Sequence, residues 1–272
     1  MNRVVARRRI VAAVLGGATV PWVSPAQPIA GSTLVLWMLA DDISGNDGDV
    51  VSAWTSKEGN SYSFAQSDDA KRPLLKKAAN GINGKNVVLF DGSNDILVCG
   101  TAFLNSEAGT VFAVWKFTST LQTGTGEILA SSDTEVNYRF CRQRAIVLNS
   151  IPNIEITTIA AAPSEKALRG STTVQAGTTY LGMWRSNGTA SSMRLNGADE
   201  TITVRAGSNT GDWYADISGL DNVTIGAGKH TSEAQHLKGS IAEIIVYNTS
   251  LGAADVAKVE SYLATRYGVT LP

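Results

Sequence analysis

The C-terminal stretch 236–272, HLKGSIAEIIVYNTSLGAADVAKVESYLATRYGVTLP, combines two patterns in close succession. From Ile241 to Tyr247 nearly every residue is β-branched or apolar, which predicts a strand covered on both faces. After the turn and N-cap signal at Asn248–Ser250, apolar side chains recur at helical spacing, and Gly268 predicts the end of that helix. A buried strand followed by a short terminal helix has a structural role, and this stretch contains no set of catalytic residues.

The remainder of the chain predicts an all-β fold. Thr110–Phe117 is apolar on both sides and is therefore expected in the middle of a sheet, and Thr33–Leu39 is expected to be a buried first strand. Short strands at about ten-residue spacing, with glycine and asparagine turns between them, predict a two-sheet antiparallel jelly-roll sandwich. The other expected strands are Val50–Trp54, Asn86–Phe90 with Ile96–Cys99 as a hairpin, Gly126–Ala130, Asn137–Phe140, Thr178–Trp184, Ser191–Leu195 and Asp221–Gly226, with weaker candidates in 143–163.

Several sequence blocks, taken in order, resemble a known family. They are Trp54–Lys57 with the following Gly59-Asn60, Arg72-Pro73, Gly81–Lys85, Val88–Asp95 and the segment GSIAEIIVYN from Gly239. This ordered set resembles the concanavalin A-like lectin/glucanase jelly rolls, in the branch related to laminin G domains. The resemblance implies one concanavalin A-like domain at 33–272, preceded by an N-terminal arm at 1–32. It implies little about function, because this fold has sugar-binding, enzymatic, adhesive and structural members.

The arm at 1–32 has two interpretations. Its basic start, its apolar segment and the small residues Ser24–Ala26 are typical of a secretory signal peptide. Alternatively, its glycines and prolines favour an extended tether that anchors the domain to a partner or to a neighbouring copy. The apolar segment is too short and too interrupted for a transmembrane helix. The residues expected to anchor the arm are Arg7, Arg8, Arg9, Val20 and Trp22.

Charge and cysteine content add few constraints. The net charge is −1, and because residues 1–30 contribute +4, the remainder carries −5. Neither value predicts a bulk electrostatic partner, and three arginines without interleaved aromatic residues do not predict nucleic-acid binding. Cys99 and Cys141 either pair or remain free thiols, and both alternatives stay open.

The motifs of the common hydrolases are missing from the sequence. The paired acids of the glucanases have no counterpart. In the nearest acidic cluster, Glu127, Asp133 and Glu135, the Ser/Thr-rich stretch between the acids is expected to be a loop. His230 and His236 are spaced poorly for zinc and are expected at the surface. We therefore predict a protein that is not an enzyme and has no cofactor. Calcium at the acidic loop 41–49 or at Asp91 and Asp95 is kept as the minor alternative to a structural turn.

A sugar site would need exposed aromatic side chains, on which pyranose faces stack. Trp213 and Tyr214, in the loop Gly207–Gly219, are the best candidate pair, and Tyr62 is a further candidate. The alternative interpretation is that all three are core or interface residues.

Two functions of different classes fit these observations. The first is a structural display protein of a phage-like virion, as a head decoration, cement or fibre component. Residues 1–30 would bind other virion or assembly proteins, many copies would lie on the virion surface, and adhesion to a cell-surface glycan could coexist with this role. The alternative is a secreted or cell-surface carbohydrate-binding module of lectin type.

Overall fold

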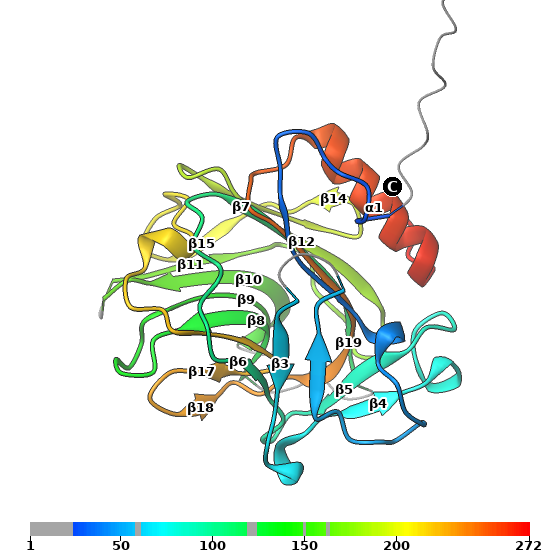
Figure 1. Cartoon of the computed structure of the whole chain (residues 1–272). Helices are drawn as coiled ribbons and strands as arrows, with labels where there is room; N and C mark the ends of the chain where they lie inside the picture. The colour runs from blue at the N-terminus through cyan, green and yellow to red at the C-terminus, as the bar shows by residue number, and fades with distance from the viewer. Residues whose placement is uncertain (1–23, 58–60, 119–123, 149–150, 162–163) are drawn as a thin grey trace, which may run out of the picture.

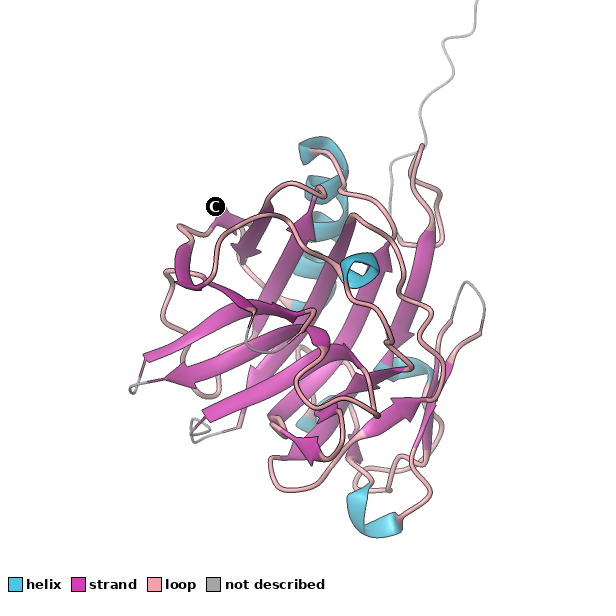
Figure 2. Cartoon of the chain, turned by 90° about the vertical axis from the view of Figure 1, so that its left-hand side faces the viewer, coloured by secondary structure: helices cyan, strands magenta, loops and turns pink. Residues whose placement is uncertain are grey.

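The structure is a computed structural model that describes residues 24–57, 61–118, 124–148, 151–161 and 164–272. These residues form two antiparallel β-sheets packed face to face, with one α-helix on the outer side of one sheet (Figures 1 and 2). The predicted all-β sandwich with a short C-terminal helix is confirmed. We refer to the sheet beneath the helix as sheet A and to the other as sheet B.

Sheet A is organised around β19 (Lys238–Tyr247), the strand predicted from the C-terminal stretch. β7 pairs along one side of β19, while β5 and β1 pair with successive halves of the other side. Among the described residues, sheet A has eight strands. The remaining seven are β1 (Leu34–Leu39), β4 (Leu74–Lys76), β5 (Val87–Asp91), β7 (Gly109–Phe117), β12 (Tyr180–Ser186), β13 (Ser191–Leu195) and β14 (Ala198–Asp199).

Sheet B is the other layer of the sandwich, and the described part of the chain contributes nine strands to it. In spatial order they are β15 (Thr203–Ala206), β11 (Glu165–Arg169), β10 (Ile151–Ile159), β9 (Phe140–Leu148), β8 (Gly124–Ser132), β16 (Asn222–Ile225), β6 (Leu97–Cys99), β3 (Ser63–Ala65) and β2 (Ala53–Thr55). A small hairpin, β17 (Gly228–Lys229) with β18 (Glu233–Ala234), stands apart from both sheets. Four 3-10 turns complete the elements: η1 (Ala40–Asp42), η2 (Asp69–Lys71), η3 (Ala78–Asn80) and η4 (Tyr214–Asp216).

The apolar character of β19 on both faces has a direct structural cause. Ile241 and Ile244 face the core between the two sheets, whereas Ala242 and Ile245 face helix α1 (Ala253–Tyr267). The helix ends at Gly268, whose φ of 69° is the left-handed conformation that favours glycine at this position. No described helix has the length and hydropathy needed to span a bilayer.

The hairpin predicted from Asn86–Phe90 and Ile96–Cys99 is wrong. β5 pairs with β4 and β19 in sheet A, whereas β6 pairs with β3 and β16 in sheet B. The intervening loop crosses between the sheets, and the Asp91 and Asp95 carboxylates accept backbone N–H bonds within it. Both strands point apolar side chains into the same core, so their pattern cannot tell which sheet each one joins.

The short strand predicted at Asn137–Phe140 is also wrong in extent. The chain instead forms two long strands, β9 and β10, which pair along their whole length as a hairpin. Their apolar pattern is interrupted because the outer face of this hairpin carries charged side chains, among them Arg142, Arg144 and Glu155. A strand with charges at alternate buried positions does not match the apolar strand pattern.

A buried carboxylate joins the helix to sheet A. Glu243 is fully buried on β19 and accepts hydrogen bonds from Trp37 Nε1 at 2.7 Å and from Tyr267 OH at 2.8 Å. Tyr262 OH donates a third hydrogen bond at 3.1 Å. Burial raises the pKa of Glu243 to about 7, although these hydrogen bonds and the Arg266 charge oppose the shift.

We expect this carboxyl group to make the stability of the protein depend on pH. A folded-state pKa near 7, above the unfolded value, means that stability is fully present below about pH 4.5 and is lost as the pH rises through 7. The expected loss in the free energy of unfolding is about 3 kcal/mol. Guanidinium unfolding of the wild type and Glu243→Gln at pH 4.5, 6 and 7.5 measures it, because the variant cannot titrate at this position. Parallel pH profiles for the two proteins would contradict the prediction.

Candidate functional site

The outer face of sheet B carries a row of charged side chains. Side chains alternate along β9, so that Cys141 faces the core while Arg142 and Arg144 face outward. Glu155 on β10 and Glu127 on β8 both lie opposite Arg144 in the strand register. Glu127 therefore lies in a strand, within the predicted strand Gly126–Ala130. β8 continues to Ser132, through part of the stretch that was expected to be a loop.

These side chains form a buried ion-pair network. The Glu155 carboxylate is fully buried and accepts hydrogen bonds from Arg144 Nε at 3.0 Å and Arg205 Nε at 3.1 Å, with Arg169 Nε at 3.7 Å. Burial alone would raise the pKa of Glu155, but the charges and hydrogen bonds of Arg144 and Arg205 outweigh it and lower the pKa. This carboxylate therefore stays ionised and holds several guanidinium groups in fixed positions.

The network has more positive than negative groups. Arg142 Nη1 donates to Glu127 Oε1 at 2.9 Å and also to Gln235 Oε1. Burial lowers the pKa of Arg142 to about 10, and its Nε atom has no hydrogen-bond partner, nor does Glu127 Oε2. Arg169 Nε also lacks a hydrogen-bond partner, so the network contains two unfilled donors and one unfilled acceptor. Four arginines (Arg142, Arg144, Arg169 and Arg205) face three glutamates (Glu127, Glu155 and Glu165), which leaves a net charge of +1.

A cleft of about 260 Å³ opens over this network. It runs across sheet B from β8 to β15. Gln235, which directly follows the hairpin β17–β18 in the chain, lines one side of the cleft. The volume suits a small ligand, and most of the lining side chains are polar or charged. The lining consists of Thr125, Tyr138, Phe140, Arg142, Arg144, Ile159, Glu165, Arg205 and Gln235.

An exposed tyrosine stands at the rim of the cleft. Tyr138 is 52% exposed and stacks on His230, with 5.9 Å between the ring centroids. His230 also contacts Phe140, and the Arg142 guanidinium lies 3.2 Å from the centroid of the Phe140 ring. His230 is buried, so its predicted surface position is wrong. Burial, together with the nearby Arg142 charge, lowers its pKa.

The aromatic residues that the sequence favoured for a sugar site lie elsewhere. Trp213 and Tyr214 are each 1% exposed and belong to the core between the sheets, so their prediction as a glycan platform is wrong. The loop folds inward because Gly109 leaves room for the Trp213 indole and because Tyr214 OH donates to Gln143 Oε1 at 2.6 Å. Tyr62 is half-buried and stacked on Phe103.

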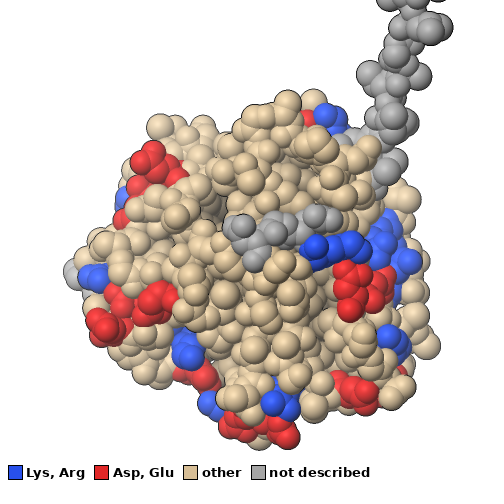
Figure 3. Space-filling view, in the orientation of Figure 1, with Lys and Arg blue, Asp and Glu red and all other residues tan. Residues whose placement is uncertain are grey.

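Other predicted sites are not brought together at the cleft. The anchor residues Arg7, Arg8, Arg9, Val20 and Trp22 lie outside the described residues. Cys99 and Cys141 are both buried free thiols, and burial raises the pKa of Cys141. In the ranges that the structure describes, no group of three acidic, histidine or cysteine side chains is arranged to hold a metal ion. On the face drawn in Figure 3, positive and negative side chains lie in small mixed groups rather than in one basic field.

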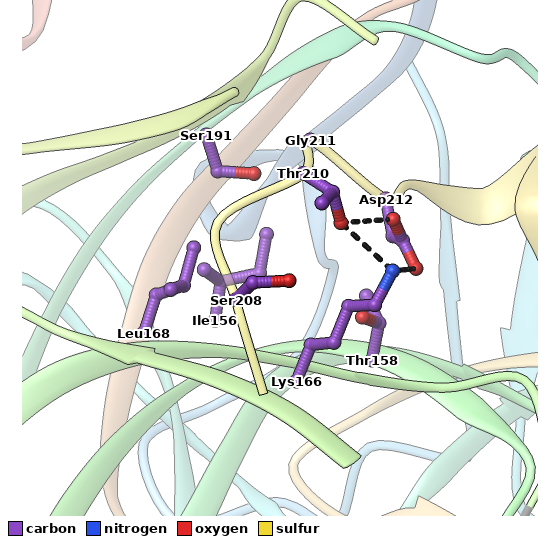
Figure 4. A pocket seen from close by; sticks show the side chains of 9 residues that line it. All are labelled: Ile156, Thr158, Lys166, Leu168, Ser191, Ser208, Thr210, Gly211 and Asp212. Carbon is purple, nitrogen blue, oxygen red and sulfur yellow. Dashed lines mark hydrogen bonds and ion pairs between the residues drawn. The ribbon is translucent and has the colours of Figure 1, made fainter. Parts of the chain in front are cut away.

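Two further hollows lie elsewhere on the described surface. One, shown in Figure 4, lies beside the hydrogen-bonded Lys166, Thr210 and Asp212, but its volume of about 10 Å³ holds no more than a water molecule. The other is a groove of about 450 Å³ next to β2, where Lys57 and Asp42 pair at 3.2 Å and balance each other's charge. Neither contains an excess charge comparable with that of the cleft.

Comparisons with known proteins bear on the fold. No family model matches the sequence, and no curated protein sequence does so either. Among solved structures, the sialidase of Trypanosoma rangeli in complex with sialic acid is 16% identical, with a TM-score of 0.52, over 88% of this chain and 33% of the sialidase. The NanB sialidase of Streptococcus pneumoniae is 16% identical, with a TM-score of 0.51, over 62% of this chain and 27% of that one.

A separate carbohydrate-binding domain also resembles part of this chain. The CBM40 of the Ruminococcus gnavus IT-sialidase, bound to alpha2,3 sialyllactose, is 18% identical, with a TM-score of 0.47, over 56% of this chain and 81% of the domain. At these identities the likeness to the two sialidases supports the lectin-like β-sandwich fold and nothing finer. Because the chain spans about a third or less of those two sialidases, their activities do not transfer to it.

Proposed function

We propose that this protein is a carbohydrate-binding module whose site is the cleft on the outer face of sheet B, and that its ligand is a sugar with a carboxylate group. The proposal rests mainly on the excess guanidinium charge beneath the cleft. Arginine binds carboxylates through paired, charge-assisted hydrogen bonds, and a buried donor without a partner is costly. A ligand carboxylate next to Arg142 or Arg205 supplies both the missing charge and the missing acceptor.

A sugar suits the cleft better than a simple anion does. The lining of the cleft also includes the uncharged polar side chains Thr125 and Gln235, which can form hydrogen bonds with ligand hydroxyl groups. A sugar acid carries a carboxylate for the arginines and hydroxyl groups for these polar side chains within one small molecule. The complexes named among the structural neighbours, with sialic acid and sialyllactose, are consistent with this ligand class.

We further propose that the module binds without cleaving its ligand. Glycoside hydrolysis needs a carboxylic acid whose pKa is raised. The pKa of Glu155 is lowered despite its burial, so this carboxylate is not available as a proton donor. Incubation with an acidic oligosaccharide is expected to leave it intact.

The proposal is tested by titration calorimetry with N-acetylneuraminic acid and glucuronic acid, against galactose and glucose as neutral sugars. We expect acidic sugars to bind more tightly, with an affinity that falls as salt is added. Arg142→Gln should weaken binding about tenfold or more, since one hydrogen bond to a charged group contributes about 1.5–3 kcal/mol. If Arg142→Gln folds poorly, the same affinity measurement is made on Arg205→Gln, whose side chain lies nearer the rim of the cleft.

Lys258→Gln is the control variant, because it removes one positive charge from an exposed position on helix α1. Its affinity is expected to stay within about twofold of the wild type, since exposed charges at this distance are screened. Equal binding of acidic and neutral sugars, or no binding of either, would show that the proposal is wrong.

The role as a virion display protein stays a prediction. It depends on the arm, of which residues 1–23 lie outside the described part of the chain, and on assembly partners. A glycan-binding site is compatible with that role. Deletion of residues 2–30 followed by an assembly assay would test it separately from the binding experiment.

A further inference from the structure

The backbone of Tyr138 has an unusual conformation. Its φ is 61°, in the left-handed region that non-glycine residues rarely adopt. Such conformations persist only where the surrounding structure enforces them, and they cluster at ligand sites. Tyr138 lies two residues before the start of β9, and its side chain remains 52% exposed even though its ring packs on a neighbour. The conformation thus presents an aromatic ring to solvent at the rim of the cleft.

This ring is the outer member of a column of stacked groups. Tyr138 stacks on His230 with an angle of 29° between the ring planes, and His230 contacts Phe140 at 6.3 Å between centroids. Phe140 in turn lies under the guanidinium of Arg142, the buried group with the unpartnered Nε. The column therefore links the Arg142 guanidinium to an aromatic ring at the rim of the cleft, and it fixes both relative to each other.

We propose that Tyr138 forms a second subsite, which binds a neutral pyranose adjoining the acidic sugar in the cleft. The inference rests on the proposed function and extends it from a single sugar to a disaccharide or longer glycan. The C–H groups on the face of a pyranose are apolar, so that a sugar ring stacks on an exposed aromatic side chain, while a carboxylate is better placed among the arginines. The ligand class is an acidic sugar linked to a neutral one.

His230 is the positioning residue of this subsite. Its ring lies between Tyr138 and Phe140, is buried, and has an Nδ1 atom without a hydrogen-bond partner. Its described contacts in the column are therefore those of an aromatic ring, and phenylalanine reproduces that shape. His230→Phe keeps an aromatic ring against Tyr138 but removes the imidazole nitrogens, whereas His230→Ala removes the ring as well. The two variants therefore distinguish support of the Tyr138 ring from the chemistry of the imidazole.

The test compares each acidic sugar alone with the same sugar linked to a neutral one. The probes are N-acetylneuraminic acid against 3′-sialyllactose, and glucuronic acid against a disaccharide of glucuronic acid and glucose. In the full-length wild type, the disaccharide is expected to bind about 3- to 10-fold more tightly than the acid alone, the range that one aromatic contact provides. Tyr138→Ala should lower the affinity for the disaccharide more than the affinity for the acid alone, and so remove this gain.

His230→Ala is expected to behave like Tyr138→Ala, and His230→Phe like the wild type. The inference is overturned if Tyr138→Ala lowers the affinity for both probes equally or for neither, or if the disaccharide binds no more tightly than the acid. If the wild type binds neither the acids nor the disaccharides, the proposed function itself is wrong, and the second subsite with it. Binding of the acids without a disaccharide gain leaves the proposed function intact and removes only the subsite.

Discussion

Glu155→Ala is expected to lower the free energy of unfolding by about 3–5 kcal/mol. The carboxylate is fully buried on β10 and is the shared partner of Arg144, Arg205 and Arg169. Its removal takes away the counter-charge that these three guanidinium groups share, so that among the described residues only Glu127 still pairs with Arg144 and only Glu165 with Arg205. Chemical denaturation monitored by tryptophan fluorescence at neutral pH measures the loss.

Glu165→Gln provides the matched control for this prediction. Glu165 also pairs with Arg205, but a third of its side chain is exposed, so its loss is expected to cost about 1 kcal/mol or less. Added sulfate should raise the midpoint of thermal unfolding of Glu155→Ala more than that of the wild type, because the anion can replace the missing charge. A stability of Glu155→Ala within about 1 kcal/mol of the wild type would mean that the network is not a coupled buried unit.

Trp213→Ala is expected to cost about 3–5 kcal/mol of stability, and the molecules that remain folded are expected to bind ligand normally. The indole is 1% exposed, packs edge to face with Tyr214 at 5.2 Å between centroids, and occupies the space that Gly109 leaves free. Its removal creates a large cavity between the two sheets. Urea unfolding gives the stability, and titration calorimetry corrected for the folded fraction gives the affinity.

Tyr138→Ala is the control for this second prediction, because it truncates an aromatic side chain that is exposed. Its stability is expected to change by about 0.5 kcal/mol or less, as for most surface substitutions. The two variants should therefore show opposite behaviour, with Trp213 affecting folding and Tyr138 affecting disaccharide binding. Loss of binding by a fully stable Trp213→Ala protein would contradict the assignment of this residue to the core.

The sequence predicts the fold well where a residue pattern can arise from only one structural arrangement. Ile241–Tyr247 is apolar on both faces because the sandwich core covers one face and α1 covers the other. Gly268 ends the helix through a backbone conformation that glycine adopts readily. The partners of β5 and β6 could not be predicted, because strands of either sheet point apolar side chains toward the same core.

The site was harder to predict for a different reason. Arg142 and Arg144 alternate with core-facing residues on β9, but this alternation is informative only once residues 140–148 are known to form a strand. Glu155 comes from β10 and Arg205 from β15, and no local spacing joins them. Exposure was equally hard to judge, since Trp213 and Tyr214 follow a glycine-containing loop that folds inward, while Tyr138 lies in a turn that was expected to be a strand.

The position of helix α1 determines which way the cleft faces when the protein is attached to a support. Ile29, near the start of the described chain, and Leu271, at its end, both pack in the cluster between α1 and sheet A. The residues that line the cleft lie on the outer face of sheet B. Sheet B is on the other side of the sandwich from α1 (Figure 2). Attachment through either end would leave the cleft facing outward. Several copies fixed on one support would then present their sites in parallel, and their avidity for a repetitive glycan surface would exceed the affinity of a single site.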